Sequence, residues 1–154
     1  MLEPGTKAPA FEGETQDGNT VRLADFAGRK LALYFYPKDD TPGCTKQACN
    51  LRDNWEALQR AGVAVVGVSK DSVESHEKFA DKYSLPFPLL SDPDREILQA
   101  YGTWGEKSLY GRIYMGIVRT TFLIDEEGVI VGVIKKPKVS GHAEEILQAF
   151  GLTQ

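Results

Sequence analysis

Two nearly continuous apolar runs, separated by a stretch of helical periodicity, constrain the fold of this chain most strongly. The runs are LALYFY at 31–36 and VAVVGVS at 63–69. Such runs are typical of strands that are covered on both faces of a parallel sheet. Between them, Thr41 is a favourable N-cap, Pro42 suits the first helical position, and Gly62 suits a helix end. The pattern predicts two parallel central strands joined by a helix.

The remaining elements are predicted from turn residues, capping residues and apolar spacing. In chain order, we expect a hairpin at 11–15 and 19–23, a helix from the Asp71 and Glu74 capping box to about Tyr83, a strand at 85–90, a helix from Asp92 to Gly102, strands at 116–125 and 129–136, and a last helix that Ser140 caps.

This order predicts a three-layer α/β sandwich with a mixed central sheet. It is the element order of the thioredoxin fold, with an N-terminal hairpin extension and an insertion at about 85–115. No internal repeat or linker-like change of composition interrupts the sequence. We therefore expect a single thioredoxin-like domain over residues 1–154.

Charge and hydropathy disfavour several kinds of partner. The chain has 18 basic and 22 acidic residues, a net charge of −4, and no basic block. Nucleic-acid and anionic-membrane partners are therefore disfavoured. No apolar run approaches the ~18 residues of a membrane span, and the first residues lack the apolar region of a secretory signal. With only two cysteines, a disulfide-rich secreted scaffold is excluded, and we expect a cytoplasmic protein.

Cys44 lies at about the third position of the helix that follows Thr41. Free N–H groups and the positive end of the helix dipole favour a thiolate there. Its spacing from Ala48 in the apolar stripe predicts a sulfur that points inward. Pro37 and Thr41 precede it at spacings that place a rigid turn and a hydroxyl beside the sulfur. Two alternatives remain: Cys44 could be a small buried apolar residue, and Thr41 could be only an N-cap.

Arg119 is a second candidate neighbour of the sulfur. It lies in VRTTFLI, a segment expected to form an internal strand. A guanidinium there is costly to bury unless an anion meets it. That anion could be the Cys44 thiolate, or a carboxylate such as Asp39 or Asp40.

Cys49 follows Cys44 by five residues. On an intact helix their Cα atoms lie about 8.7 Å apart and face directions about 140° apart, beyond the ~7 Å limit for a disulfide without backbone movement. A permanent disulfide in a regular helix is therefore disfavoured. Either the two cysteines never meet, or the first turns unwind when they do, which costs little at a helix terminus.

The sequence gives little indication of a metal site or of a phosphate-binding site. The two histidines, His76 and His142, fall in separate expected helices without ligand spacing, and we expect both to be solvated. A structural zinc site needs four ligands. No phosphate-binding glycine loop is present. We expect no metal and no cofactor.

The string YPKDDTPGCTKQACNLRD at 36–53 resembles the peroxiredoxin family, because Pro37, Thr41 and Cys44 match its Pro-x-x-x-Thr-x-x-Cys motif. A second cysteine five residues on, Cys49, is similar to the peroxiredoxin Q branch, also called bacterioferritin comigratory protein. The resemblance extends over nearly the whole chain, through LLSDPDREILQAYGTWGEKS, GIVRTTFLIDEEG and GHAEEILQAF.

The resemblance implies a thiol-dependent peroxidase that acts on hydrogen peroxide or organic hydroperoxides. Cys44 would attack the peroxide and become a sulfenic acid, while Thr41 and Arg119 stabilise the leaving oxygen and Pro37 shields the site. Cys49 would resolve the sulfenic acid as an intramolecular disulfide, which thioredoxin or a similar dithiol reduces. The branch resemblance also implies a monomer, although relatives dimerise.

Other functions remain possible on the same fold. A thiol–disulfide oxidoreductase usually carries CxxC, whereas the spacing here is CxxxxC. A redox-sensing interaction protein could use the same cysteine switch, and rapid peroxide turnover would distinguish an enzyme from such a sensor. A non-catalytic domain would require Thr41, Cys44 and Arg119 to coincide by chance.

Overall fold

The two apolar runs form the centre of a mixed sheet, as predicted. β3 (Lys30–Phe35) and β4 (Val63–Ser69) are parallel neighbours, with Lys30 opposite Val63 and Phe35 opposite Val68. The sheet has seven strands in the order β2-β1-β5-β4-β3-β8-β9. The computed structural model describes residues 2–152, so residues 1 and 153–154 of the expected domain lie outside the described residues.

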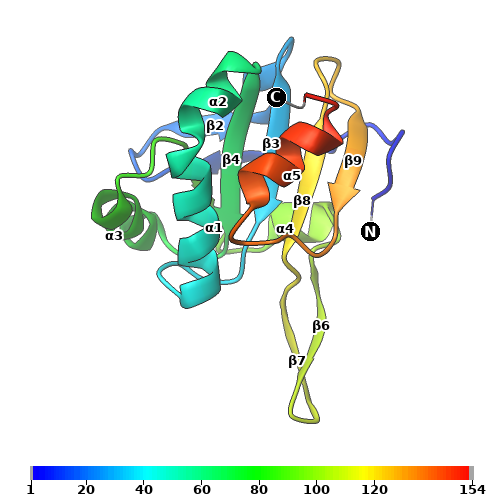
Figure 1. The fold of residues 1–154 in the computed structure, drawn as a ribbon. Helices are drawn as coiled ribbons and strands as arrows, with labels where there is room; N and C mark the ends of the chain where they lie inside the picture. The colour runs from blue at the N-terminus through cyan, green and yellow to red at the C-terminus, as the bar shows by residue number, and fades with distance from the viewer. Residues whose placement is uncertain (1, 153–154) are drawn as a thin grey trace.

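In the described residues, five helices and a 3₁₀ turn surround the strands (Figure 1). The elements besides β3 and β4 are β1 (Glu12–Glu14), β2 (Thr20–Arg22), η1 (Leu23–Phe26), α1 (Pro42–Asp53), α2 (Trp55–Arg60), α3 (Val73–Tyr83), β5 (Leu89–Ser91), α4 (Glu96–Ala100), β6 (Trp104–Leu109), β7 (Arg112–Ile117), β8 (Thr120–Ile124), β9 (Ile130–Ile134) and α5 (His142–Ala149).

Alternation along the central strands divides the core between the two faces of the sheet. Ala32 and Tyr34 of β3 pack with α1, α3 and α5, whereas Leu33 and Phe35 pack with α4 and the N-terminal segment. Figure 1 shows α1, α2 and α5 on one face of the sheet, with α4 behind it. The three-layer α/β sandwich and its thioredoxin-like mixed sheet are therefore confirmed.

Several expected helix boundaries were wrong. The helix after Thr41 ends at Asp53, and a break at Asn54 separates it from α2. Ser72, not Asp71, caps α3, because its side chain accepts a hydrogen bond from Ser75 N. The Asp71 carboxylate is engaged elsewhere, by Asp39 N and Ser69 Oγ.

Two elements expected within the 85–115 insertion, and the last helix, also differ from expectation. The strand expected at 85–90 is confined to Leu89–Ser91, and α4 begins at Glu96, four residues after Asp92. The last helix is capped by Gly141 and begins at His142, so Ser140 is not its cap.

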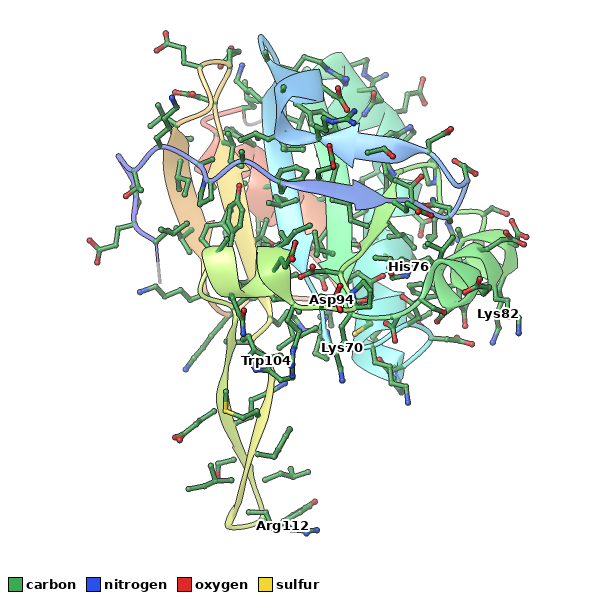
Figure 2. All side chains as sticks on the ribbon, turned by 180° about the vertical axis from the view of Figure 1, so that it is seen from behind. Lys70, His76, Lys82, Asp94, Trp104 and Arg112 are labelled. Atoms are coloured by element: carbon green, nitrogen blue, oxygen red, sulfur yellow. The ribbon has the colours of Figure 1, made fainter. Side chains whose placement is uncertain are left out.

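The expected strand at 116–125 is divided into β7 and β8, with Arg119 in the short connection between them. β7 pairs with β6 in a two-stranded hairpin that projects from the body of the protein, with Arg112 at its tip (Figure 2). Tyr110 and Gly111 turn the hairpin with φ values of 51° and 80°. Within the described residues, no helix combines the length and apolar character needed to cross a membrane.

Candidate active site

Cys44 lies at the start of α1, where the sequence forces a helix to begin. Thr41 is extended, with φ −100° and ψ 157°, and Pro42 occupies the first helical position. Cys44 is therefore the third helical residue, among N–H groups that have no partner inside the helix. Its side chain is only 2% exposed and packs with Ala48 and Tyr34, so the inward-pointing sulfur is confirmed.

Arg119 contacts this sulfur directly. Its Nη2 atom donates to Cys44 Sγ at 3.3 Å, and its Nη1 atom donates to Gln47 Oε1 at 2.6 Å. The two contacts fix the plane of the guanidinium against one face of α1. Of the two anions left open by the sequence, the structure selects the cysteine, because Asp39 and Asp40 bind other groups.

Gly43 makes room for that arginine. A Cβ atom at Gly43 would lie 3.2 Å from Arg119 Nη2, which is tighter than an ordinary contact. The small size of the residue just before Cys44 thus has a steric reason. The sequence signals a helix start at this position but not the approach of a side chain from 76 residues away.

Two buried polar atoms close to the site lack a hydrogen-bond partner among the described residues. They are Gln47 Nε2 and the Tyr34 hydroxyl. Burial raises the pKa of Tyr34 well above 10.0, and a negative charge on Cys44 raises it further. Unpaired buried groups of this kind commonly mark a functional site or the place of an ordered water.

Thr41 and Pro37 lie at the two ends of the loop that leads from β3 into α1, and the threonine hydroxyl is engaged by the backbone of that loop. Thr41 Oγ1 donates to Lys38 O at 2.8 Å and makes no capping bond to α1. Its oxygen keeps lone pairs with which to accept a hydrogen bond. Pro37 is half-buried at the start of the loop between β3 and α1.

Cys49 lies on the same unbroken helix as Cys44, and both are free thiols. Because α1 is helical from Pro42 to Asp53, the pair cannot bridge in this conformation. The next residue, Asn50, connects α1 to the start of α5. Its Nδ2 atom donates to Ser140 O at 3.0 Å, and its Oδ1 atom accepts from Ala143 N at 2.8 Å.

The base of the projecting hairpin borders the site. Lys107 of β6 donates to Ile117 O at 2.9 Å. Burial and the positive charge of Arg119 lower the pKa of Lys107, whereas a charge on Cys44 raises it. Trp104 lies beside Lys70 in Figure 2, and the lysine Nζ atom is 5.7 Å from its ring centroid. Sequence reasoning did not identify Lys70 or Lys107, because their partners lie in other elements.

Both histidines are fully buried, so the expectation of solvated histidines was wrong. His142 Nε2 lies 2.8 Å from Thr121 Oγ1, and His142 Nδ1 lies 3.0 Å from Glu145 Oε1. Burial lowers the pKa of His142 below 6.5, although Glu145 opposes the shift. His76 contacts Asp39 beneath the loop that precedes Cys44.

Asp39, Asp71 and His76 form the one cluster in the described part of the chain with three metal-ligating side chains, whose ligand atoms lie within 4.8 Å of one another. Hydrogen bonds to protein groups already engage each of these side chains. These three side chains are not hydrogen-bond partners of Cys44, whose sulfur accepts from Arg119.

Comparison with known proteins agrees with this geometry. The AhpC/TSA family model matches residues 4–133. Peroxiredoxin Bcp of Escherichia coli K12 is 49% identical over 146 residues, covering 95% of this chain and 94% of that protein. Peroxiredoxin Bcp of Bacillus subtilis is 46% identical over 149 residues, covering 97% and 95%.

Solved structures show the same fold. The bacterioferritin comigratory protein of Xanthomonas campestris, studied for its alkyl peroxide reduction activity, is 37% identical, with a TM-score of 0.89 over 97% of this chain and 98% of that one. A mutant of peroxiredoxin Q from Xylella fastidiosa is 34% identical, with a TM-score of 0.91 over 98% and 96%. With a cysteine at a helix N-terminus and an arginine on its sulfur, the chain belongs to the AhpC/TSA family as a Bcp, or peroxiredoxin Q, type peroxiredoxin, a thiol-dependent peroxidase.

Proposed function

We propose that Cys44 is the peroxidatic cysteine of this peroxidase. The observation that carries the proposal is the 3.3 Å contact between Arg119 Nη2 and Cys44 Sγ at the N-terminus of α1. The thiolate attacks one peroxide oxygen, the O–O bond breaks, and a proton converts the leaving oxygen to water or an alcohol. Cys44 becomes a sulfenic acid.

Arg119 and the first N–H groups of α1 stabilise the charge that develops on the departing oxygen. Donors fixed in place before the reaction need no reorganisation when the charge appears. Gln47 holds the arginine in that orientation through the 2.6 Å contact. This contact gives Gln47 a positioning role that sequence reasoning did not assign.

Thr41 and Pro37 complete the site. Because the Thr41 hydroxyl hydrogen is committed to Lys38 O, its oxygen is suited to accept a hydrogen bond from the O–H group of the peroxide. That contact would orient the peroxide before attack. Pro37 would limit the access of water to the sulfur.

Cys49 resolves the sulfenic acid. After the first turns of α1 unwind, its thiol attacks the Cys44 sulfur, an S–S bond forms, and water leaves. A dithiol such as thioredoxin then reduces the disulfide. We propose hydrogen peroxide and organic hydroperoxides as substrates, a monomeric single domain, and a cytoplasmic location, with no metal or cofactor in the cycle.

Intact mass spectrometry after one equivalent of peroxide tests this function. In the reduced wild-type protein, we expect rapid loss of two hydrogens and protection of both thiols from alkylation. Cys49→Ser should gain one oxygen and stall, and Cys44→Ser should not react. Retention of both free thiols in the wild type for minutes would contradict the proposal. Slow turnover with a dithiol would instead favour a redox sensor.

A further inference from the structure

A carboxylate is buried in the loop that leads to the reactive cysteine. Asp39 lies four residues after the end of β3 and is only 8% exposed. Its Oδ1 accepts from the Tyr36 hydroxyl at 2.6 Å, and its Oδ2 accepts from Ser75 Oγ at 2.8 Å. Oδ2 also lies 2.7 Å from His76 Nδ1. Tyr36, Asp39, Ser75 and His76 are called the Asp39 anchor below.

Hydrogen-bond accounting shows that a proton lies between Asp39 and His76. His76 Nε2 faces Leu90 O at 3.0 Å, and a carbonyl can only accept, so Nε2 carries a hydrogen. The 2.7 Å contact on the other side then also needs a hydrogen, on Nδ1 or on the carboxyl group. Removing either partner would leave a buried polar group unpaired, which is costly.

The backbone of the loop is fixed at the same point. Asp39 N donates to Asp71 Oδ2 at 2.9 Å, and that oxygen also accepts from Ser69 Oγ at the end of β4. The loop is thus attached to both α3 and β4. Figure 2 shows His76 on the side of α3 that faces the sheet, whereas Lys82 of the same helix points outward.

A second fixed point follows the resolving cysteine. Asn50 connects α1 to the start of α5 by two hydrogen bonds, and Leu51 is fully buried in the core. The segment between Asp39 and Asn50 contains both cysteines. It includes the helix start, where few intrahelical bonds oppose unwinding.

We propose that the Asp39 anchor is a positioning device that limits the unwinding of α1 to residues 40–49 and holds Cys44 against Arg119 until it has reacted. This proposal rests on the proposed Cys44–Cys49 cycle. A shorter free segment has less chain entropy to gain on unwinding, so the anchor stabilises the helical state. Loss of the anchor should therefore slow the first oxidation and favour the unwound state that forms the disulfide.

The Cys44 sulfenic acid has two competing fates that report this balance. Cys49 can attack it, forming the disulfide and water. Alternatively, a second peroxide can oxidise the folded form, giving a sulfinic acid and releasing water or an alcohol. The ratio of disulfide to sulfinic acid at a fixed peroxide excess measures how readily α1 unwinds. Simple loss of structure would not be expected to slow the first oxidation of Cys44 while it speeds disulfide formation.

The experiment compares Asp39→Ala with Asp40→Asn in the full chain. Asp40 is the neighbouring exposed acid, paired with Lys82, and its φ of 56° is tolerated by asparagine. For Asp39→Ala we expect the disulfide-to-sulfinic ratio to rise about five-fold, the effect of freeing roughly one residue. Sulfenic acid formation should slow by a smaller factor, because only the unwound fraction of the protein stops reacting. Asp40→Asn should match the wild type in both.

Two further variants keep the test decisive. Asp39→Asn should restore wild-type behaviour, because its amide can donate to a neutral His76 and its oxygen can accept from Tyr36. If Asp39→Ala does not fold, Tyr36→Phe removes one bond of the anchor and should shift both rates in the same directions by a smaller factor. An unchanged ratio in the folded variants would overturn the proposal. Absence of a disulfide in the wild type would instead overturn the proposed cycle.

Discussion

Arg119 illustrates how a single side chain organises the site. It donates to the cysteine sulfur at 3.3 Å and to a buried amide oxygen at 2.6 Å. Two fixed contacts determine the position and the plane of a guanidinium, and a planar fork is the feature that lysine lacks. Arg119 therefore presents a directed donor at the sulfur in addition to a positive charge.

Arg119→Met should slow the oxidation of Cys44 by hydrogen peroxide about 100-fold, which is the cost of losing one fixed donor to a developing oxyanion. Stopped-flow measurement under single turnover checks this. Arg112→Met is the matched control, since Arg112 is an exposed arginine at the tip of the hairpin (Figure 2). Equal rates in the two variants would show that the contact does not serve the reaction.

Gly43 gives a second prediction at this scale. Gly43→Ala should raise the free energy of unfolding slightly, because alanine is the better helix former by roughly 0.5–1 kcal/mol. It should nevertheless slow Cys44 oxidation several-fold, since the new Cβ atom presses on Arg119 Nη2 at 3.2 Å. Gly141→Ala at the start of α5, where a Cβ meets nothing within 4 Å, is the control. A slower reaction in both variants would argue against the steric reason.

Single-residue expectations succeeded where the partner is close in sequence and failed where it is distant. Pro42 and the spacing from Cys44 to Ala48 correctly predicted the helix start and the buried sulfur. His76 was misplaced because its contacts, Asp39 and Leu90 O, come from other elements. The catalytic roles of Pro37, Thr41, Cys44, Cys49 and Arg119 stay predictions.

At the scale of elements, apolar runs and turn residues predicted the central strands, whereas the β6–β7 hairpin was missed. Its turn uses Tyr110 and Gly111, which lack the asparagine or aspartate that usually signals such a turn. Its strands carry exposed Leu109, Ile113 and Met115, so no alternation of buried and exposed residues marks them. A two-stranded hairpin with little packing is only marginally stable in water.

Limited chymotrypsin digestion should therefore cut first at the hairpin tip, after Tyr110, which is 97% exposed. The two fragments should stay associated, because β8 of the second fragment pairs with β3 of the first. Mass spectrometry under native and denaturing conditions checks both points. The internal controls are Tyr34 and Tyr36, both 1% exposed. Early cleavage there would show that the core opens before the hairpin.

At the scale of the whole molecule, the site is assembled from segments that are far apart in the sequence. The cysteine comes from α1, its arginine from the β7–β8 connection, and the α3 residue His76 contacts Asp39 of the loop before α1. Only the sheet brings these together, since β3 pairs with β4 on one side and β8 on the other. Sequence patterns describe each segment, but they do not show which segments contact one another in the fold. For this reason the sequence left two partners open for Arg119, the Cys44 thiolate and a carboxylate.

Burial of His142 links the fold as a whole to pH. Its folded-state pKa lies below 6.5 because burial disfavours the charged ring, whereas the unfolded chain keeps the ordinary value. Below about pH 6.5 the unfolded state therefore binds a proton that the folded state does not. The contribution of neutral His142 is complete above pH 6.5 and declines as the pH falls, until the folded-state pKa is reached.

His142→Gln should remove this part of the acid sensitivity. The wild-type free energy of unfolding should fall by up to about 1.4 kcal/mol per pH unit more steeply than that of the variant below pH 6.5. Urea unfolding of the reduced proteins between pH 7.5 and 5 measures the two slopes, and their difference isolates His142 from the carboxylates common to both. Parallel curves would mean that the folded protein accommodates a protonated His142, through Glu145 at 3.0 Å, as readily as water does.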